Sequence, residues 1–530
     1  MFSFRARYLS GKLTGSCCSL STLRTSRVQS YTHYRPATFK LQRSHISTMG
    51  KPLVLAIDGT WVNSDNGYNA SMSGPGAKGR LASPSNVTRI CRAVLPRSPS
   101  GVQQLVYYQG GLGSDANAYS FVVGGYLGSG IDEAIREAYS FLAMNYEEGD
   151  EIFLVGFSRG AFTARSVGSL IAEVGLLTKA GLESFYPIFK DWENQNIASY
   201  EPGYESAAWP IAGRPKFGDK AYNEQLAGKK LTRLNIPIKA IAVFDTVGTL
   251  GVPDVRPFGI SLYNSAKTEY SFVNTQVAPN VENAYQALAL DEQRYAFAPT
   301  VWESPRDSSS HMLKELKQCW FPGVHTTVGG GFQDTNISDI TLAWVLTQLS
   351  QFLAFDEGYL LRQRKQNGDF YIEKKTEEEG RGYGLGLIKA SDGGLLNTIL
   401  GRKARTPGEY LLTDPKTGEQ MPGKPLLNTR EFIHPSVRYR MHNGGRQPSS
   451  DPEAKLGEGA YAPKPLADWT YIAAGEDTPK GIKIDAKWAK APKWVRKSTG
   501  TYIVEDKIVD GSLEAVLAET WSGVGNWLKL

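Results

Sequence analysis

The feature that most constrains this chain is a short apolar run that ends in a glycine-flanked serine and continues at once as a helix. Residues 151–155 (EIFLV) have the length of a buried strand. The sequence predicts a tight turn at residues 156–160 (GFSRG) and a helix over residues 160–174. Before the strand, residues 131–146 carry apolar side chains at helical spacing. Because helices and strands alternate, the pattern predicts a doubly wound α/β fold, in which a mostly parallel sheet carries helices on both faces.

Other segments extend this alternation. Apolar runs such as 52–57 (PLVLAI) and 238–244 (IKAIAVF) are typical of strands buried on both faces of a parallel sheet. Further strands are expected at 104–108 and 295–302, and further helices at 87–94, around 281–290 and at 339–353. Beyond residue 355 the content of charged residues, glycine and proline rises, so residues 355–530 are predicted to be insertions and a C-terminal accessory region.

The positive charge of the chain is concentrated at its N-terminus. Residues 1–50 hold eight lysines or arginines and no acidic residue, so the formal net charge of +6 leaves the rest of the chain close to neutral. A near-neutral body gives no electrostatic reason to expect a nucleic-acid partner. The leader, residues 1–48, has the composition of a mitochondrial transit peptide, and the alternatives are a disordered segment or a true start at Met49. We therefore expect an intracellular protein, mitochondrial if the leader is a transit peptide and otherwise cytoplasmic.

Cysteine content and hydropathy exclude several classes of protein. The chain has four cysteines, two of them in the leader, which is neither a disulfide framework nor a zinc-binding pattern. No uninterrupted apolar run reaches the roughly 18 residues that a membrane-spanning helix needs. We expect no metal, no cofactor and no transmembrane helix.

The turn at 156–160 matches G-x-S-x-G, the pattern of a nucleophile elbow. A serine on a sharp strand-to-helix turn has an exposed hydroxyl, and small residues two positions away on either side, here Gly156 and Gly160, let the backbones approach. The backbone N–H of Arg159 would then point into an oxyanion hole at the start of the helix. The alternative is that Ser158 is only a small residue at a tight joint.

A serine nucleophile needs a base and an acid, which in this architecture follow the serine in the order Asp or Glu, then His. Asp245 ends the predicted strand 238–244, and His325 lies in the loop FPGVHTTVGGGF. Strand ends at the carboxyl edge of a parallel sheet are where catalytic groups gather. The alternatives are a strand-end carboxylate that caps a turn and an ordinary loop histidine. Of the other histidines, two lie in the leader, one in a polar loop and two in the accessory region.

The end of the first strand, Asp58-Gly59-Thr60, admits two interpretations. An aspartyl-nucleophile phosphatase would require a carboxylate at position 56, where this chain has Ala56. We expect instead that this turn lies beside the Ser158 turn and that the N–H of Gly59, Thr60 or Trp61 completes the oxyanion hole. Asp58 could equally be a structural turn residue.

Six motifs together resemble a known family. AIDGTW, YYQGGLGS, GFSRGAFTAR, VFDTVGTLG, ALALDEQRYAFAPTVW and WFPGVHTTVGGGF occur in order between residues 56 and 332. The set is similar to the catalytic domain of the type VI secretion phospholipase effectors, an α/β-hydrolase-like domain that is also widespread in fungi. The resemblance covers about residues 51–353 and implies that residues 49–354 are the catalytic domain.

The resemblance implies a serine esterase in which Ser158 is the nucleophile, Asp245 the acid and His325 the base. Bacterial members act as phospholipases on membrane lipids, so we expect a lipid or phospholipid-like ester as substrate and peripheral contact with a membrane. Two departures bear on the pocket: family members often have histidine where Tyr285 stands, and Thr327 replaces the usual acidic residue after the base. The competing hypotheses are a catalytically silent scaffold and, using the same triad, a peptidase or thioesterase.

Overall fold

The structure is a computed structural model of the whole chain, which divides into two units, Met1–Thr48 and Met49–Leu530. All residues described below belong to the second unit, so the predicted leader lies outside them. The described residues are 50–59, 68–69, 80–111, 130–197, 199–200, 214–247, 275–307, 309–373, 381–391, 401–414, 420–449, 457–479 and 481–528.

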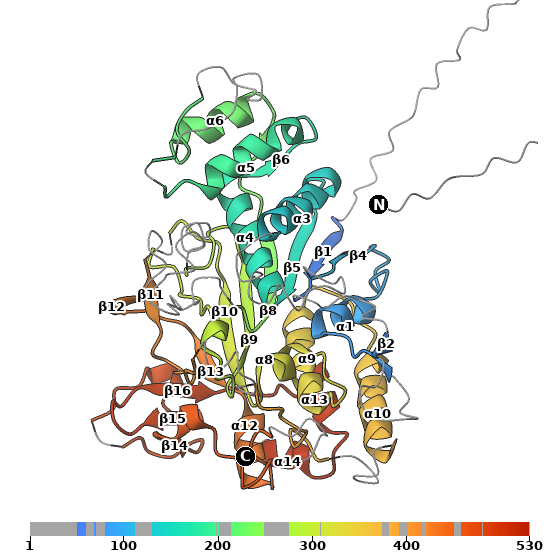
Figure 1. The fold of residues 1–530 in the computed structure, drawn as a ribbon, viewed down its shortest axis with the longest axis vertical. Helices are drawn as coiled ribbons and strands as arrows, with labels where there is room; N and C mark the ends of the chain where they lie inside the picture. The colour runs from blue at the N-terminus through green and yellow to red at the C-terminus, as the bar shows by residue number, and fades with distance from the viewer. Residues whose placement is uncertain are drawn as a thin grey trace, which may run out of the picture. The chain divides into compact units, whose positions relative to one another are not determined.

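A single ten-stranded sheet organises the second unit (Figure 1). Its strand order is β14-β15-β16-β13-β10-β9-β8-β5-β1-β4, and all pairs from β16 to β4 are parallel, whereas β14 and β15 pair antiparallel at one edge. The strands are β1 (Pro52–Ile57), β4 (Leu105–Gln109), β5 (Glu151–Phe157), β8 (Ile238–Phe244), β9 (Asn283–Ala289), β10 (Glu315–Phe321), β13 (Glu431–Ile433), β14 (Trp469–Ile472), β15 (Lys493–Arg496) and β16 (Tyr502–Glu505). The mostly parallel sheet confirms the predicted α/β fold class.

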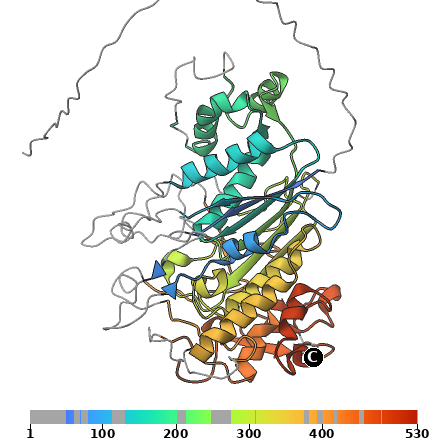
Figure 2. The ribbon, with the colours of Figure 1, turned by 90° about the vertical axis from the view of Figure 1, so that its right-hand side faces the viewer.

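Helices cover both faces of this sheet (Figure 2). Side chains alternate along a strand, so Ile152 and Leu154 of β5 pack into one hydrophobic cluster and Phe153 and Val155 into another on the opposite face. The first face carries α3 (Ile131–Asn145), α4 (Arg159–Val174), α5 (Phe185–Glu193) and α6 (Lys220–Gly228). The second carries α1 (Asn86–Ala93), α9 (Asn336–Leu349), α10 (Gly358–Glu373) and α13 (Leu513–Ala518).

The remaining α-helices and β-strands of the described residues are short. They are the helices α8 (His325–Gly329), α12 (Pro435–His442) and α14 (Val524–Leu528), and the paired strands β2 (Tyr68–Asn69) with β3 (Arg80–Leu81), β6 (Leu176–Leu177) with β7 (Thr232–Arg233), and β11 (Leu411–Thr413) with β12 (Gln420–Pro425). Within the described residues, no helix has the length and apolar character needed to span a bilayer.

Two predicted elements are wrong. The expected helix around 281–290 is the strand β9, and the expected strand at 295–302 holds the 3-10 turn Tyr295–Phe297 and irregular residues. NAYQALA has good intrinsic helix formers, but all seven residues are buried between β8 and β10, and this tertiary context overrides helix propensity.

The C-terminal region continues the sheet of the predicted catalytic domain. β13 pairs parallel with β10, β16 pairs parallel with β13, and α13 packs in the cluster that contains α9. Residues 49–530 therefore form one compact unit, and the boundary at 354/355 stays a sequence-based prediction.

The glycines around Ser158 make close backbone contacts. A Cβ on Gly160 would lie 2.2 Å from the carbonyl oxygen of Ile57, and one on Gly156 would lie 2.5 Å from the carbonyl oxygen of Gly160. A side chain at either position would thus force β1, β5 and α4 apart.

We expect Gly160→Ala to lower the free energy of unfolding by about 1–3 kcal/mol, because the added methyl group overlaps backbone that cannot rotate away. Gly228→Ala is the matched control, since a Cβ there has no neighbour within 4 Å. In a helix that change should be neutral or stabilising by up to about 1 kcal/mol. Urea unfolding followed by circular dichroism measures both, and equal stabilities would contradict the close packing at Gly160.

Candidate active site

The predicted site residues follow strands that are neighbours in the sheet. Ser158 follows β5, Asp245 follows β8, and His325 lies four residues beyond β10, at the start of α8. β5, β8, β9 and β10 are consecutive and parallel, so their carboxyl ends meet at one edge of the sheet (Figure 1). That edge is where doubly wound folds bind ligands.

Ser158 occupies a strained turn between β5 and α4. Its backbone has φ 58° and ψ −122°, a left-handed φ that is rare for any residue other than glycine. Its N–H donates to the carbonyl of Phe244, the residue before Asp245, at 3.1 Å. The turn therefore joins the ends of β5 and β8 and presents the serine where a nucleophile elbow would.

Asp245 and His325 form a buried hydrogen-bonded pair. Asp245 Oδ2 lies 2.7 Å from His325 Nδ1, and Asp245 Oδ1 accepts from the backbone N–H of Ala289 at 3.0 Å. The carboxylate is an acceptor, so Nδ1 carries a proton, and the tautomer that this hydrogen bond selects has its lone pair on Nε2. The rings of Phe157 and Phe297 pack against the imidazole, with centroids 4.7 Å and 4.9 Å away.

A third partner of this pair is Arg405, which the sequence analysis missed. Its Nη2 donates to Asp245 Oδ2 at 3.0 Å and its Nη1 to Asp245 Oδ1 at 3.3 Å, and its side chain is buried. Burial would raise the pKa of Asp245, but Arg405 and then His325 hold it below its ordinary value. No motif surrounds Arg405 in GRKARTPGEY, and the contact spans 160 residues, so no local signal indicated it.

The motif ALALDEQR anchors the histidine loop. Asp291 accepts from the N–H of Gly323 at 2.6 Å, and Glu292 Oε2 accepts from the N–H of His325 at 3.2 Å. Burial raises the pKa of Asp291 to about 6. The pKa of Glu292 is lowered to about 2, because hydrogen bonds and charge from Arg294 outweigh burial. Two adjacent carboxyls thus hold both ends of the segment that leads into α8.

This low pKa gives a pH-dependent stability prediction. An acid whose pKa falls from 4.5 to about 2 on folding stabilises the protein above pH 4.5, and that stability is lost as the pH falls toward 2. The contribution of Glu292 is on the order of 3 kcal/mol at neutral pH. We expect Glu292→Gln to be less stable than wild type at pH 7, by a difference that shrinks below pH 4.5. Urea unfolding across this range measures it, and a difference independent of pH would rule out the effect.

The predicted oxyanion residues fall into three groups. Arg159 opens α4, and the first N–H groups of a helix have no partner within the helix. The N–H of Gly59 donates to Asp58 Oδ1 at 2.8 Å, and its role as one of the three candidate oxyanion donors stays a prediction. Gly59 also has a steric role, because a Cβ there would lie 3.2 Å from Cβ of Ser158. Thr60 and Trp61 lie outside the described residues.

Asp58 has the structural role that the sequence left open. Its carboxylate is buried and also accepts from the hydroxyls of Ser85 at 2.6 Å, Tyr108 at 2.9 Å and Thr88 at 3.1 Å. It therefore ties the end of β1 to the start of α1 and to β4.

The two departures from the family pattern lie within packed surroundings. Tyr285, in the amino half of β9, donates to Glu315 Oε2 at 2.8 Å, and Glu315 is the first residue of β10. Thr327 is buried in α8. Trp302, Trp320 and Trp344 are core residues exposed by 2% or less.

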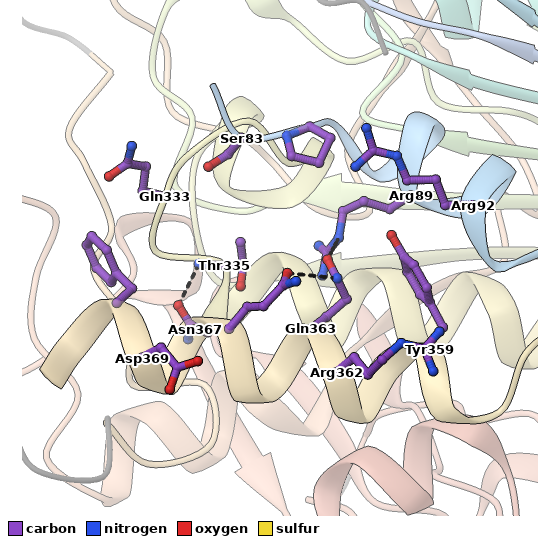
Figure 3. A pocket seen from close by; sticks show the side chains of 13 residues that line it. Ser83, Arg89, Arg92, Gln333, Thr335, Tyr359, Arg362, Gln363, Asn367 and Asp369 are labelled. Carbon is purple, nitrogen blue, oxygen red and sulfur yellow. Dashed lines mark hydrogen bonds between the residues drawn. The ribbon is translucent and has the colours of Figure 1, made fainter. Parts of the chain in front are cut away.

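A cavity of about 560 Å³ lies at another place, between α1, α10 and the loop before α9 (Figure 3). None of the three predicted catalytic residues lines it. Of its arginines, Arg89 pairs with Asp339 and Arg362 with Asp356. We therefore assign it no part in the site at the sheet edge.

Several known proteins are similar to part of this chain. The chain is 28% identical over 273 residues to the uncharacterized protein YEL023C of Saccharomyces cerevisiae, covering 47% of this chain and 32% of that protein. An uncharacterized protein from Pseudomonas aeruginosa, solved by crystallography, has a TM-score of 0.28 and 16% identity, covering 57% of this chain and 46% of its own. The Tle1 effector, solved bound to the VgrG spike of the type 6 secretion system, has a TM-score of 0.24 and 18% identity, covering 54% and 51%.

The chain thus spans about a third of the yeast relative and about half of each solved chain. The family assignment rests on a match over residues 51–348, which is more than half of the chain and contains Ser158, Asp245 and His325. The chain belongs to the family described as the catalytic domain of Tle1-like phospholipase effectors of the type VI secretion system.

Proposed function

We propose that this protein is a serine hydrolase that cleaves carboxylic esters of lipids, with Ser158 as nucleophile, His325 as base and Asp245 as acid. The observation that carries the proposal is the buried Asp245–His325 hydrogen bond, at the same sheet edge as a serine on a strained turn. The neighbours of Ser158 reach both partners: Phe157 packs on the imidazole, and the Ser158 N–H binds the carbonyl that precedes Asp245.

The mechanism uses the geometry as follows. His325 Nε2 accepts the proton of Ser158 Oγ as the oxygen attacks the ester carbonyl, and Asp245 stabilises the imidazolium that forms. The Arg159 N–H, with a second donor from Thr60 or Trp61, stabilises the oxyanion. The tetrahedral intermediate collapses to an acyl-enzyme and the alcohol takes the proton from His325. Water then attacks the acyl-enzyme, with His325 again as base, and releases the acid.

The family supports the substrate class. Its description names phospholipase effectors, so the ester is proposed to be a lipid or phospholipid, met at the membrane surface by peripheral contact. No step of this mechanism calls for a metal or an organic cofactor.

The test is a substrate panel with the full chain. We expect hydrolysis of long-chain p-nitrophenyl esters or of phosphatidylcholine and phosphatidylglycerol vesicles, together with covalent labelling by a fluorophosphonate probe. Cleavage only of thioesters or peptides would keep the triad but replace the substrate class. A folded protein that neither labels nor hydrolyses any substrate would support the alternative of a catalytically silent scaffold.

A further inference from the structure

The region beyond the matched family domain reaches into the candidate site. Residues 349–530 lie outside the match at 51–348, yet the side chain of Arg405 ends on the carboxylate of Asp245. We propose that Arg405 is a positioning residue of the reaction, which orients the Asp245 carboxylate and balances its charge beside His325. This inference rests on the proposed function and adds a member to its machinery from the predicted accessory region.

Arg405 contacts both the acid, Asp245, and Phe297, a residue that packs against the base. Its guanidinium contacts both oxygens of Asp245, at 3.0 Å and 3.3 Å, and Nη2 also donates to the carbonyl of Phe297 at 2.7 Å. The ring of Phe297 in turn packs edge-on against the imidazole of His325. A planar fork of donors on a carboxylate sets orientation as well as charge, which a lysine amine does not.

The charges around His325 balance only with this arginine present. Two buried carboxyls bind His325, Asp245 at the ring Nδ1 and Glu292 at the backbone N–H. Arg405 interacts electrostatically with both, and Arg294 pairs with Glu292. Among the residues that the structure describes, the network is also flanked by Tyr410, which interacts with Arg405, and by Asp291 with Tyr461 and Arg440.

Several contacts hold the segment that carries Arg405. The N–H of Lys403 donates to the carbonyl of Gln293 at 2.8 Å, and the N–H of Tyr295 donates to that of Gly401 at 3.2 Å. Before and after this segment, Ser391 donates to Glu292 at 2.6 Å and Tyr461 donates to Asp291 at 2.8 Å. The ALALDEQR motif therefore joins the histidine loop on one side to the C-terminal region on the other.

Removing Arg405 should raise the pH at which the Asp245–His325 pair takes up a proton. Asp245 would remain buried without the positive charge of the guanidinium, and a proton on the imidazole could replace that charge. The Asp245–His325 pair would therefore take up a proton at higher pH. A protonated pair cannot accept the proton of Ser158. The acid limb of reactivity should therefore move toward higher pH, whereas a merely structural role would change the amount of folded protein and not this limb.

The experiment measures the rate constant of fluorophosphonate labelling of the full chain from about pH 5 to pH 9. We expect Arg405→Met to shift the acid limb upward by at least about one pH unit. The matched control is Arg438→Met, which removes a buried arginine from an ion pair with Glu505 in the same C-terminal region, 2.9 Å between Nη2 and Oε1. The acid limb of the pH profile of Arg438→Met should coincide with that of wild type.

The outcomes separate the two proposals. Wild type that does not label overturns the proposed function itself. Wild type that labels, with an unshifted limb in folded Arg405→Met, overturns the positioning role alone. If Arg405→Met does not fold, Arg405→Lys is the deciding variant. The lysine keeps the positive charge but lacks the paired donors of the guanidinium. Its labelling rate constant on the high-pH plateau should therefore fall roughly tenfold, for one lost charge-assisted hydrogen bond. A wild-type plateau in Arg405→Lys would equally overturn the inference.

Discussion

Ser158→Ala is expected to abolish fluorophosphonate labelling and to lower ester hydrolysis by roughly 10⁵-fold or more. The hydroxyl is the only group of the proposed triad that forms a bond to the substrate, so its loss removes the acyl-enzyme route entirely. The residual rate would come from the oxyanion hole and from binding. Removing Oγ should also leave the fold intact, because Ser158 keeps its backbone bond to Phe244.

The matched control for this variant is Ser166→Ala. Ser166 lies in the same helix, α4, is fully buried, and donates to the carbonyl of Phe162 at 2.9 Å. Ser166→Ala should keep labelling and turnover near the wild-type values. Fluorophosphonate labelling measures the first, and stopped-flow or steady-state hydrolysis of a p-nitrophenyl ester measures the second. Hydrolysis that survives in Ser158→Ala at the wild-type rate would refute Ser158 as nucleophile.

Asp245→Asn carries the second large expected effect, on both activity and stability. An amide at this position favours the wrong imidazole tautomer, which should lower turnover by about 10⁴-fold. It also leaves Arg405, exposed by 4%, without its countercharge in the interior. Breaking one side of a buried ion pair costs about 3–5 kcal/mol of stability.

The double variant Asp245→Asn with Arg405→Met separates these two effects. Removing the stranded guanidinium should recover part of the lost stability, while labelling stays as low as in Asp245→Asn. Thermal unfolding and fluorophosphonate labelling of the four proteins in this cycle give the coupling between the two residues. Additive losses of stability would mean that Asp245 and Arg405 do not act as a pair.

Local patterns were sufficient where neighbouring residues carry the constraint. The apolar run of β5, the two glycines and the serine determine a strand, a turn and a helix within about 20 residues, and the structure has all three. The pairing of Asp245 with His325 also agrees with the sequence, because residues that follow parallel strands gather at one edge of the sheet.

Local sequence patterns gave the wrong prediction where burial in the folded protein determines the secondary structure. The segment NAYQALA combines helix formers, but in the structure it is the central strand β9, since its neighbours β8 and β10 supply the hydrogen bonds and the apolar surroundings. The hydrogen bond from the N–H of Gly59 to the carboxylate of Asp58 was likewise not expected from the sequence. Both results depend on partners that the sequence analysis could not place.

By itself, the sequence determined the α/β class, the strained serine turn and the order of the triad candidates, because periodicity and glycine spacing act over a few residues. Only the tertiary structure decided that Arg405 lies on Asp245 and that the C-terminal strands continue the sheet. The pair forms between residues 160 positions apart, because a buried cation and a buried carboxylate stabilise each other only when folding removes both from water. No local sequence pattern encodes such a contact.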